Sequence, residues 1–188
     1  MKKFVKNFQQ NFLPEINHSK NDEVIRDSLF VIQQNRTIKF FDTNVSSTQK
    51  VVNVNCKAIQ MTICRIIQKV DESEVDDRWC FAVASEKGEL FVIDYFTFEE
   101  VCHFFVSNET LIQLSFNFEY NLIVMIFEKE AALVDIENEK IVDSIQITPF
   151  RVASSFADLL LFGYDSGHVQ RAKIEDRHLA LCDDRKKS

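Results

Sequence analysis

The sequence predicts an all-β protein built from four similar units. One eight-residue pattern occurs four times in the 188 residues, as NRTIKFFD, KGELFVID, EKEAALVD and SGHVQRAK. Each copy follows an apolar run and a short polar turn, which is the arrangement of a β-hairpin. The composition agrees, because Phe occurs 18 times and aromatic residues favour strands.

The two central strands of each unit are defined by aligning the four octets without gaps. The last position of the octet is occupied by Asp42, Asp94, Asp135 and Lys173. Apolar runs precede each octet, and the residues thirteen positions earlier are Leu29, Phe81, Leu122 and Leu160. Because runs such as NLIVMIF are apolar at nearly every residue, we expect strands that are covered on both faces. The predicted core therefore contains Phe81, Val83, Leu122, Val124, Leu160 and Phe162.

Two further strands flank each hairpin. The segments TQKVVNV, EVCHFFV, KIVDSIQI and HLALC follow the octets, and AIQMTICRII, TLIQLSFN and RVASSFA precede the last three hairpins. KNFQQNF is a poorer first copy of the preceding strand. Each unit therefore has four antiparallel strands, which we name a to d in chain order. One alternative stays open, because FTFEEVCHFF at 96–105 could also form a helix.

The repeat spacing suggests a known architecture. The octets are separated by 52, 41 and 38 residues, and this pattern resembles the WD40-like β-propeller repeat of about 40–45 residues per four-stranded blade. The first spacing is longer because of an insertion at 69–77. The octet is similar to the family's strand that ends in Trp-Asp, and the Trp place is filled by Phe41, Ile93, Val134 and Ala172. The Gly-His dipeptide that usually opens a blade is missing, so the repeats are degenerate.

The resemblance implies one domain over residues 1–188, a partial or small propeller. The expected blades cover 8–54, 57–106, 110–147 and 150–182, followed by a short basic tail at 185–188. An open arc of four blades would expose an apolar face and strand edges at its ends. We therefore expect either that KKFVKNF closes a small ring or that a partner or second copy covers the ends.

The function implied by the resemblance is a non-catalytic protein-interaction scaffold, or a subunit of a larger intracellular complex, with no cofactor. Loops at the blade ends usually carry contacts, and in this family the b–c turns and the d–a connections line one end. The candidate contact residues there are Asn35, Arg36, Glu86, Lys87, Glu128, Lys129, Asp165 and His168.

The insertion at 69–77 provides a second candidate surface, which we expect at the opposite end of the blades. Its acidic residues are Asp71, Glu72, Glu74, Asp76 and Asp77. It could be a flexible, solvated loop or a docking loop for a basic partner. Ser73 lies three residues before an acid and could be phosphorylated, which would deepen the negative charge.

Composition argues against several other classes of function. The formal net charge of −7 is unfavourable for nucleic-acid binding, and only three glycines are present, too few for a Gly-rich phosphate loop. The five cysteines include no C-x-x-C pair, which disfavours a disulfide framework or a structural zinc site. The sequence has neither a secretory leader nor an apolar run of about 18 residues. We therefore expect an intracellular protein, in the cytoplasm or the nucleus.

No catalytic motif emerges from the sequence. Cys102 and His103 are adjacent on a predicted strand and should point to opposite faces, so they are not expected to form a catalytic pair. Neighbouring acids such as Glu99 and Glu100 are expected to be solvated. Two other functions remain open: a β-domain that binds a small apolar ligand, suggested by the Phe content, and an enzyme whose site is assembled from distant residues.

Overall fold

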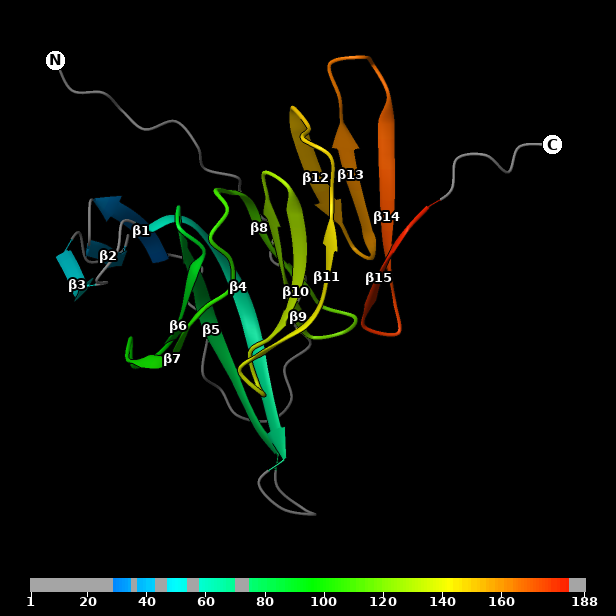
Figure 1. Ribbon diagram of the computed structural model, residues 1–188. Coiled ribbons are helices and arrows are strands. Elements are labelled where there is room, and N and C mark those ends of the chain that lie inside the picture. The colour runs from blue at the N-terminus through cyan, green and yellow to red at the C-terminus, as the bar shows by residue number, and fades with distance from the viewer. Residues whose placement is uncertain (1–28, 35–36, 43–46, 54–57, 70–74, 183–188) are drawn as a thin grey trace, which may run out of the picture.

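The computed structural model describes residues 29–34, 37–42, 47–53, 58–69 and 75–182. All the regular elements in these ranges are β-strands, arranged in four antiparallel sheets (Figure 1). The all-β class and the antiparallel blades are thus confirmed. The strand at β7 also excludes the helix that we left open for 96–105.

The four sheets follow the predicted order along the chain, and each strand pairs with the next. Blade 1 contains β1 (Leu29–Gln34), β2 (Thr37–Asp42) and β3 (Ser47–Asn53). Blade 2 contains β4 (Ala58–Lys69), β5 (Val75–Ser85), β6 (Glu89–Asp94) and β7 (Glu100–Phe105). Blade 3 contains β8 (Leu111–Asn117), β9 (Leu122–Phe127), β10 (Glu130–Asp135) and β11 (Lys140–Gln146). Blade 4 contains β12 (Val152–Phe156), β13 (Leu159–Gly163), β14 (Val169–Glu175) and β15 (His178–Leu181).

The described part of blade 1 is a three-stranded sheet. KNFQQNF, the expected fourth strand, lies outside the described residues, as does KKFVKNF, the segment expected to close a ring.

The pairing of the two central strands differs by one residue among the blades. In blade 1, Leu29 pairs with Asp42, the last residue of the octet. In blades 2 and 4 the residues opposite the octet ends are Cys80 and Leu159, one position before Phe81 and Leu160. The hairpin turns of these two blades are one residue longer, so the correspondence slips by one.

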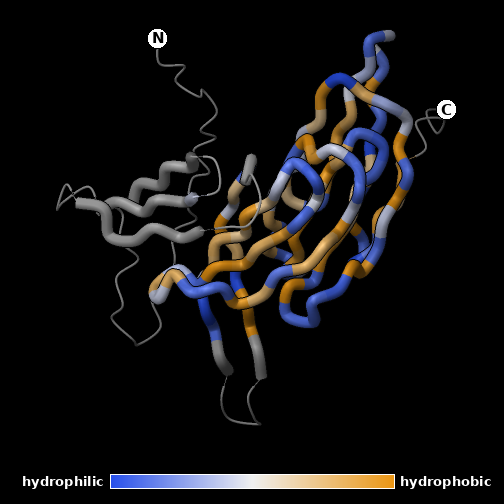
Figure 2. Tube along the Cα trace, turned by 60° about the vertical axis from the view of Figure 1, so that its left-hand side comes forward, coloured by the Kyte–Doolittle hydropathy of each residue, from blue (hydrophilic) through white to orange (hydrophobic). Residues whose placement is uncertain are grey.

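The core lies between the blades. Ala82 and Val92 of blade 2 belong to one buried cluster with Ile123 and Val134 of blade 3. The opposite face of blade 3 packs against blade 4, and β9 is buried at every residue. All six predicted core residues are at most 2% exposed. Figure 2 shows the resulting pattern, with apolar residues along the strands between the blades and hydrophilic residues at many turns.

The innermost strands β4, β8 and β12 lie side by side, and the outer strands β11 and β15 also meet. Blade 4 ends the described stack. Its outward face is exposed: the exposed fractions of Val152 and Phe156 are 62% and 82%.

Candidate functional site

The b–c turns and the d–a connections are joined at one end of blades 2 to 4. Glu86 O accepts a hydrogen bond from Leu111 N at 3.2 Å, and Lys129 O accepts one from Ile147 N at 2.8 Å. We call this surface the turn end. Six of its eight predicted contact residues lie in exposed turns of blades 2 to 4, namely Glu86, Lys87, Glu128, Lys129, Asp165 and His168. Asn35 and Arg36 lie outside the described residues.

Side chains at the turn end make ion pairs that remain open to solvent. The Nζ of Lys129 lies 3.9 Å from the carboxylate of Glu109, and Arg151 Nε donates to Asp165 at 2.7 Å. Both members of the second pair are about three-quarters exposed. Such pairs contribute about 0–1 kcal/mol, so a binding partner could replace them at little cost.

Blade 2 carries a two-stranded ribbon at the opposite end (Figure 1). β6 pairs with β5 only over Cys80–Ala84, whereas β4 and β5 continue to pair as far as Lys69 and Val75. Of the insertion predicted as a loop at 69–77, Lys69 ends β4 and Val75, Asp76 and Asp77 begin β5, while 70–74 lie outside the described residues. Asp76 and Asp77 belong to β5, while Asp71, Glu72 and Glu74 lie outside the described residues.

One group of side-chain contacts joins the two strands of the ribbon. Arg65 forms a salt bridge with Asp77, and its guanidinium carbon lies 5.8 Å from the centre of the Trp79 ring. The hydrogen bonds that Arg65 donates to the carboxylate of Asp77 raise the pKa of Arg65 above its ordinary value. Asp77 is thus already paired, although its side chain is still 37% exposed.

The recurrent aspartate of the octet closes the c–d turn. Asp94 Oδ1 accepts hydrogen bonds from the backbone N–H groups of Phe96 and Thr97, both at 2.8 Å. Asp135 accepts in the same way from Asn138 N at 3.1 Å. This residue type recurs because the turn needs a short side-chain acceptor, not because the protein needs a reactive acid.

Asp135 also joins two blades. Arg177, in the c–d turn of blade 4, donates a hydrogen bond to its carboxylate. Burial by itself raises the pKa of Asp135, but the hydrogen bonds from Asn138 and the charge of Arg177 outweigh burial and hold this pKa below its ordinary value. The buried acid is therefore ionised and paired.

The sequence reasoning missed a polar seam between the innermost strands. The side-chain amide of Gln60 donates to Ile112 O at 2.5 Å and accepts from Leu114 N at 2.6 Å. It thereby pairs with the free edge of β8 as a backbone strand would. The only signal in the sequence was the Ile-Gln dipeptide shared by AIQMTIC and LIQLSFN.

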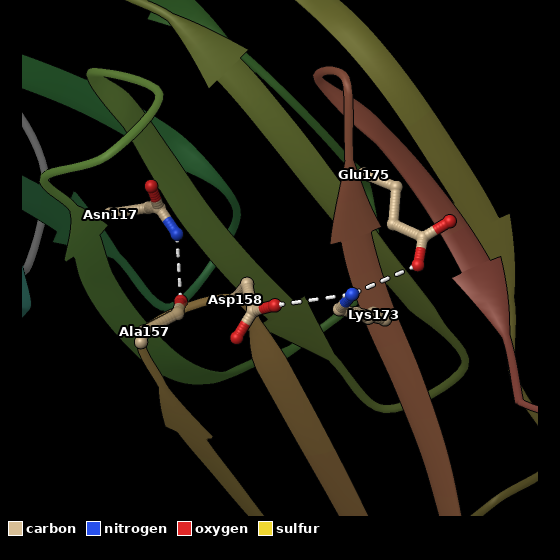
Figure 3. Close-up of polar contacts among 5 residues, drawn as sticks. All are labelled: Asn117, Ala157, Asp158, Lys173 and Glu175. Carbon is tan, nitrogen blue, oxygen red and sulfur yellow. Dashed lines mark hydrogen bonds and ion pairs between the residues drawn. The ribbon is translucent and has the colours of Figure 1, made fainter.

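The same device joins blades 3 and 4. With its amide oriented to satisfy both groups, Gln113 donates to Ala153 O at 3.1 Å and accepts from Ser155 N at 3.2 Å. Ser115 shares a hydrogen bond of 2.6 Å with the hydroxyl of Ser155. Further along the seam, Asn117 Nδ2 donates to the backbone oxygen of Ala157 at 2.7 Å (Figure 3).

The side chains of Cys102 and His103, which we considered as a pair, lie on opposite faces of β7, as expected for adjacent strand residues. Cys102 is buried and His103 is exposed, where its ring stacks on Phe91 at 4.0 Å. Burial, together with the charges of Glu139 and Glu100, raises the pKa of Cys102 to about 12. A protonated thiol is a poor nucleophile.

Metal binding has no site in the part of the chain that the structure describes. This part contains no group of three or more histidine, cysteine or acidic side chains that could hold a metal ion. Every buried side-chain nitrogen or oxygen there has a hydrogen-bond partner. No helix in these ranges is long and apolar enough to cross a membrane.

Comparison with known proteins identifies the fold. No family model matches the sequence, and no curated protein matches it. Among solved structures, the WD40 β-propeller domain of Doa1 superposes with a TM-score of 0.59 at 14% sequence identity. The chain has the fold of a partial WD40 β-propeller. The match covers 81% of this chain and 49% of the Doa1 domain, so the chain spans about half the length of the structure that it matches.

Proposed function

We propose that the chain is a non-catalytic protein-interaction scaffold and a subunit of a larger intracellular assembly. The observation that carries this proposal is the exposed outward face of blade 4. Every face of blade 3 is covered by a neighbouring blade, whereas Val152, Phe156 and Val169 on the last face are 49–82% exposed. Adjacent exposed apolar side chains of this kind commonly mark an interface.

The WD40-like fold supports the same function, because propellers of this type are generally interaction platforms. The turn end would supply a second contact surface through the exposed side chains of Glu86, Lys87, Glu128, Lys129, Asp165 and His168. Asp76 and Asp77 of the ribbon, with the acidic residues that the sequence carries at 71–74, would offer a third surface to a basic partner. The four described cysteines form no disulfide, which fits a reducing compartment.

The test is to isolate the tagged chain from its own cells and to measure the mass of the purified species by light scattering. We expect the chain to be retained with other proteins at a fixed stoichiometry in physiological salt. The Val124→Asp variant, whose core should not fold, is the control and should lose these partners. A chain that is recovered alone as a monomer would contradict the proposal.

A further inference from the structure

The connection between blades 3 and 4 carries an exposed hydroxyl group beside a proline. Residues 147–151 join β11 to β12, read Ile-Thr-Pro-Phe-Arg, and belong to neither strand. Thr148 and Pro149 are both exposed. The chain has only two prolines, and this is its only Thr-Pro or Ser-Pro pair. One hydroxyl residue of the chain is thus set apart from the others by its neighbour.

The connection is fixed at both ends and open between them. Ile147 N donates to Lys129 O at 2.8 Å, and Arg151 N donates to Gly163 O, also at 2.8 Å. A residue before proline favours an extended backbone, and the proline nitrogen has no hydrogen that needs an acceptor. The Thr-Pro pair is therefore held at the turn end in a position where another protein can reach it.

The residues Thr-Pro-Phe-Arg have the pattern that proline-directed protein kinases accept. The pocket that follows the acceptor hydroxyl in such a kinase suits proline, because any other residue would bring an N–H group without an acceptor. Kinases of this class also favour a basic side chain at the third position after the acceptor. Arg151 occupies that position here, and its side chain is 75% exposed. Thr148 therefore combines an accessible hydroxyl with both recognition elements.

A phosphate on Thr148 would have a cation within the same turn region. Thr148 Oγ1 donates to the hydroxyl of Tyr164 at 3.0 Å, and Arg151 Nε donates to Asp165, the next residue, at 2.7 Å. The pair of Arg151 and Asp165 is open to solvent and therefore weak. A phosphate carries about −1.5 to −2 charges and accepts strong hydrogen bonds from a guanidinium group. Arg151 can therefore exchange the carboxylate of Asp165 for the phosphate.

We propose that Thr148 is a phosphorylation site for a proline-directed protein kinase. The kinase transfers the γ-phosphoryl group of ATP: the bond from the γ-phosphorus to the oxygen that leaves with ADP breaks, a bond from Thr148 Oγ1 to phosphorus forms, and the hydroxyl proton passes to a base of the kinase. The turn end of blades 3 and 4 carries two cations, Lys129 and Arg151, and two exposed acids, Glu128 and Asp165. Phosphorylation gives this surface a net negative charge.

The modification changes a surface that we propose for partner binding. Only this effect on partners rests on the proposed scaffold function, because the phosphate transfer needs nothing but the kinase, ATP and the exposed connection. The phosphate would also remove the hydrogen that Thr148 donates to Tyr164. A partner that contacts the turn end would therefore meet a different charge and a different hydrogen-bond pattern after phosphorylation.

The test incubates the purified full-length chain with ATP, Mg²⁺ and a purified proline-directed kinase that favours a basic third position. Mass spectrometry should find one phosphate, on Thr148, and Thr148→Val should remove it. The initial rate should fall about tenfold or more for Pro149→Ala and about threefold to tenfold for Arg151→Gln. The matched control is Thr110→Val, which alters the exposed threonine of the connection between blades 2 and 3 and should change nothing. Thermal unfolding shows that each variant is still folded.

Phosphorus NMR tests the partner of the phosphate. In the phosphorylated chain, the phosphate should titrate at a lower pH than in the phosphorylated Arg151→Gln variant, because the guanidinium group stabilises the dianion. Equal titration of the two would show that Arg151 stays with Asp165 and would overturn the exchange.

The chain isolated from its own cells provides the decisive measurement. Phosphopeptide mapping should find phosphate on Thr148. An unmodified Thr148 in these cells, or a rate with the purified kinase that does not depend on Pro149, would overturn the proposal. If the isolated chain is a monomer without partners but carries phosphate on Thr148, the scaffold function falls and the phosphorylation site stands.

Discussion

Asp135 of blade 3 and Arg177 of blade 4 form an ion pair that joins the ends of two adjacent blades. The aspartate side chain is 4% exposed and the arginine side chain is 43% exposed. Asp135 also accepts two hydrogen bonds from Asn138, so one carboxylate both closes its own turn and holds the next blade.

This pair predicts a pH-dependent stability. The pKa of Asp135 is lowered in the folded chain, so its contribution is fully present above the ordinary carboxyl pKa of about 4 and is lost as the pH falls through the folded pKa. Asp135→Asn should lower the free energy of unfolding at neutral pH by about 2 kcal/mol. The variant should also lose less stability than the wild type on acidification below about pH 4. Urea titrations at several pH values measure both effects, and Asp165→Asn, an exposed partner of Arg151, should change stability by less than about 0.5 kcal/mol.

The repeat in the sequence was sufficient to predict the fold. The apolar runs and the recurring octet report strands covered on both faces, and the buried β9 is an example. The register was harder, because the extra turn residue in blades 2 and 4 leaves the apolar pattern almost unchanged. The acidic insertion was predicted as a loop because charge dominates it, but pairing with β4 makes Asp76 and Asp77 strand residues.

The candidate surfaces were only partly predictable. Exposed turns can be located from polar residues between apolar runs, as at Glu128 and Lys129. The outward face of blade 4 could not be found in this way, because RVASSFA and LLLFG have the same apolar character as the covered strands. Whether a strand face meets a neighbour depends on where the stack ends, which is a property of the assembled fold.

The blade assignment predicts a severe effect at Val124. This side chain is 2% exposed between blades 3 and 4, so Val124→Asp places an unpaired charge in an apolar layer. We expect a loss of about 3–5 kcal/mol in the free energy of unfolding. Ile141→Asp, at a position that is 43% exposed, should cost about 1 kcal/mol or less. Thermal unfolding compares the stability of the two variants. An unchanged melting temperature for Val124→Asp would refute the blade assignment.

The polar seam between the innermost strands predicts that Gln60 stabilises the contact between blades 2 and 3. Gln60→Ala removes the partners of both Ile112 O and Leu114 N and should cost about 1–3 kcal/mol in chemical denaturation. Gln146→Ala, an exposed change on β11, is the control and should have little effect. Equal stability of the two variants would mean that the seam contributes nothing.

The a–b turn of blade 4 predicts a stabilising substitution. Ala157 has a φ of 50°, a left-handed conformation that costs an L-residue about 1–2 kcal/mol. Ala157→Gly removes this strain and keeps the bond from Asn117, which goes to the backbone oxygen. After the added entropy of the unfolded chain, we expect a gain of up to about 1 kcal/mol. Ala180→Gly, at an exposed position of β15, should instead destabilise by about 0.5–1 kcal/mol. Urea unfolding of the two variants should therefore give changes of opposite sign.

Two glycines separate backbone strain from steric contact. Gly88 and Gly167 both have positive φ, 74° and 79°. A Cβ at Gly88 would lie 2.1 Å from the backbone oxygen of Ser107, whereas a Cβ at Gly167 would meet nothing within 4 Å. Gly167→Ala should therefore cost about 1–2 kcal/mol from strain alone. Gly88→Ala should cost several kcal/mol more, because the d–a connection at Ser107 must move and the hydrogen bond from Val106 N to Gly88 O is strained with it. Urea unfolding of the two variants measures the difference in the free energy of unfolding. Similar losses for the two variants would show that the d–a connection at Ser107 moves at little cost.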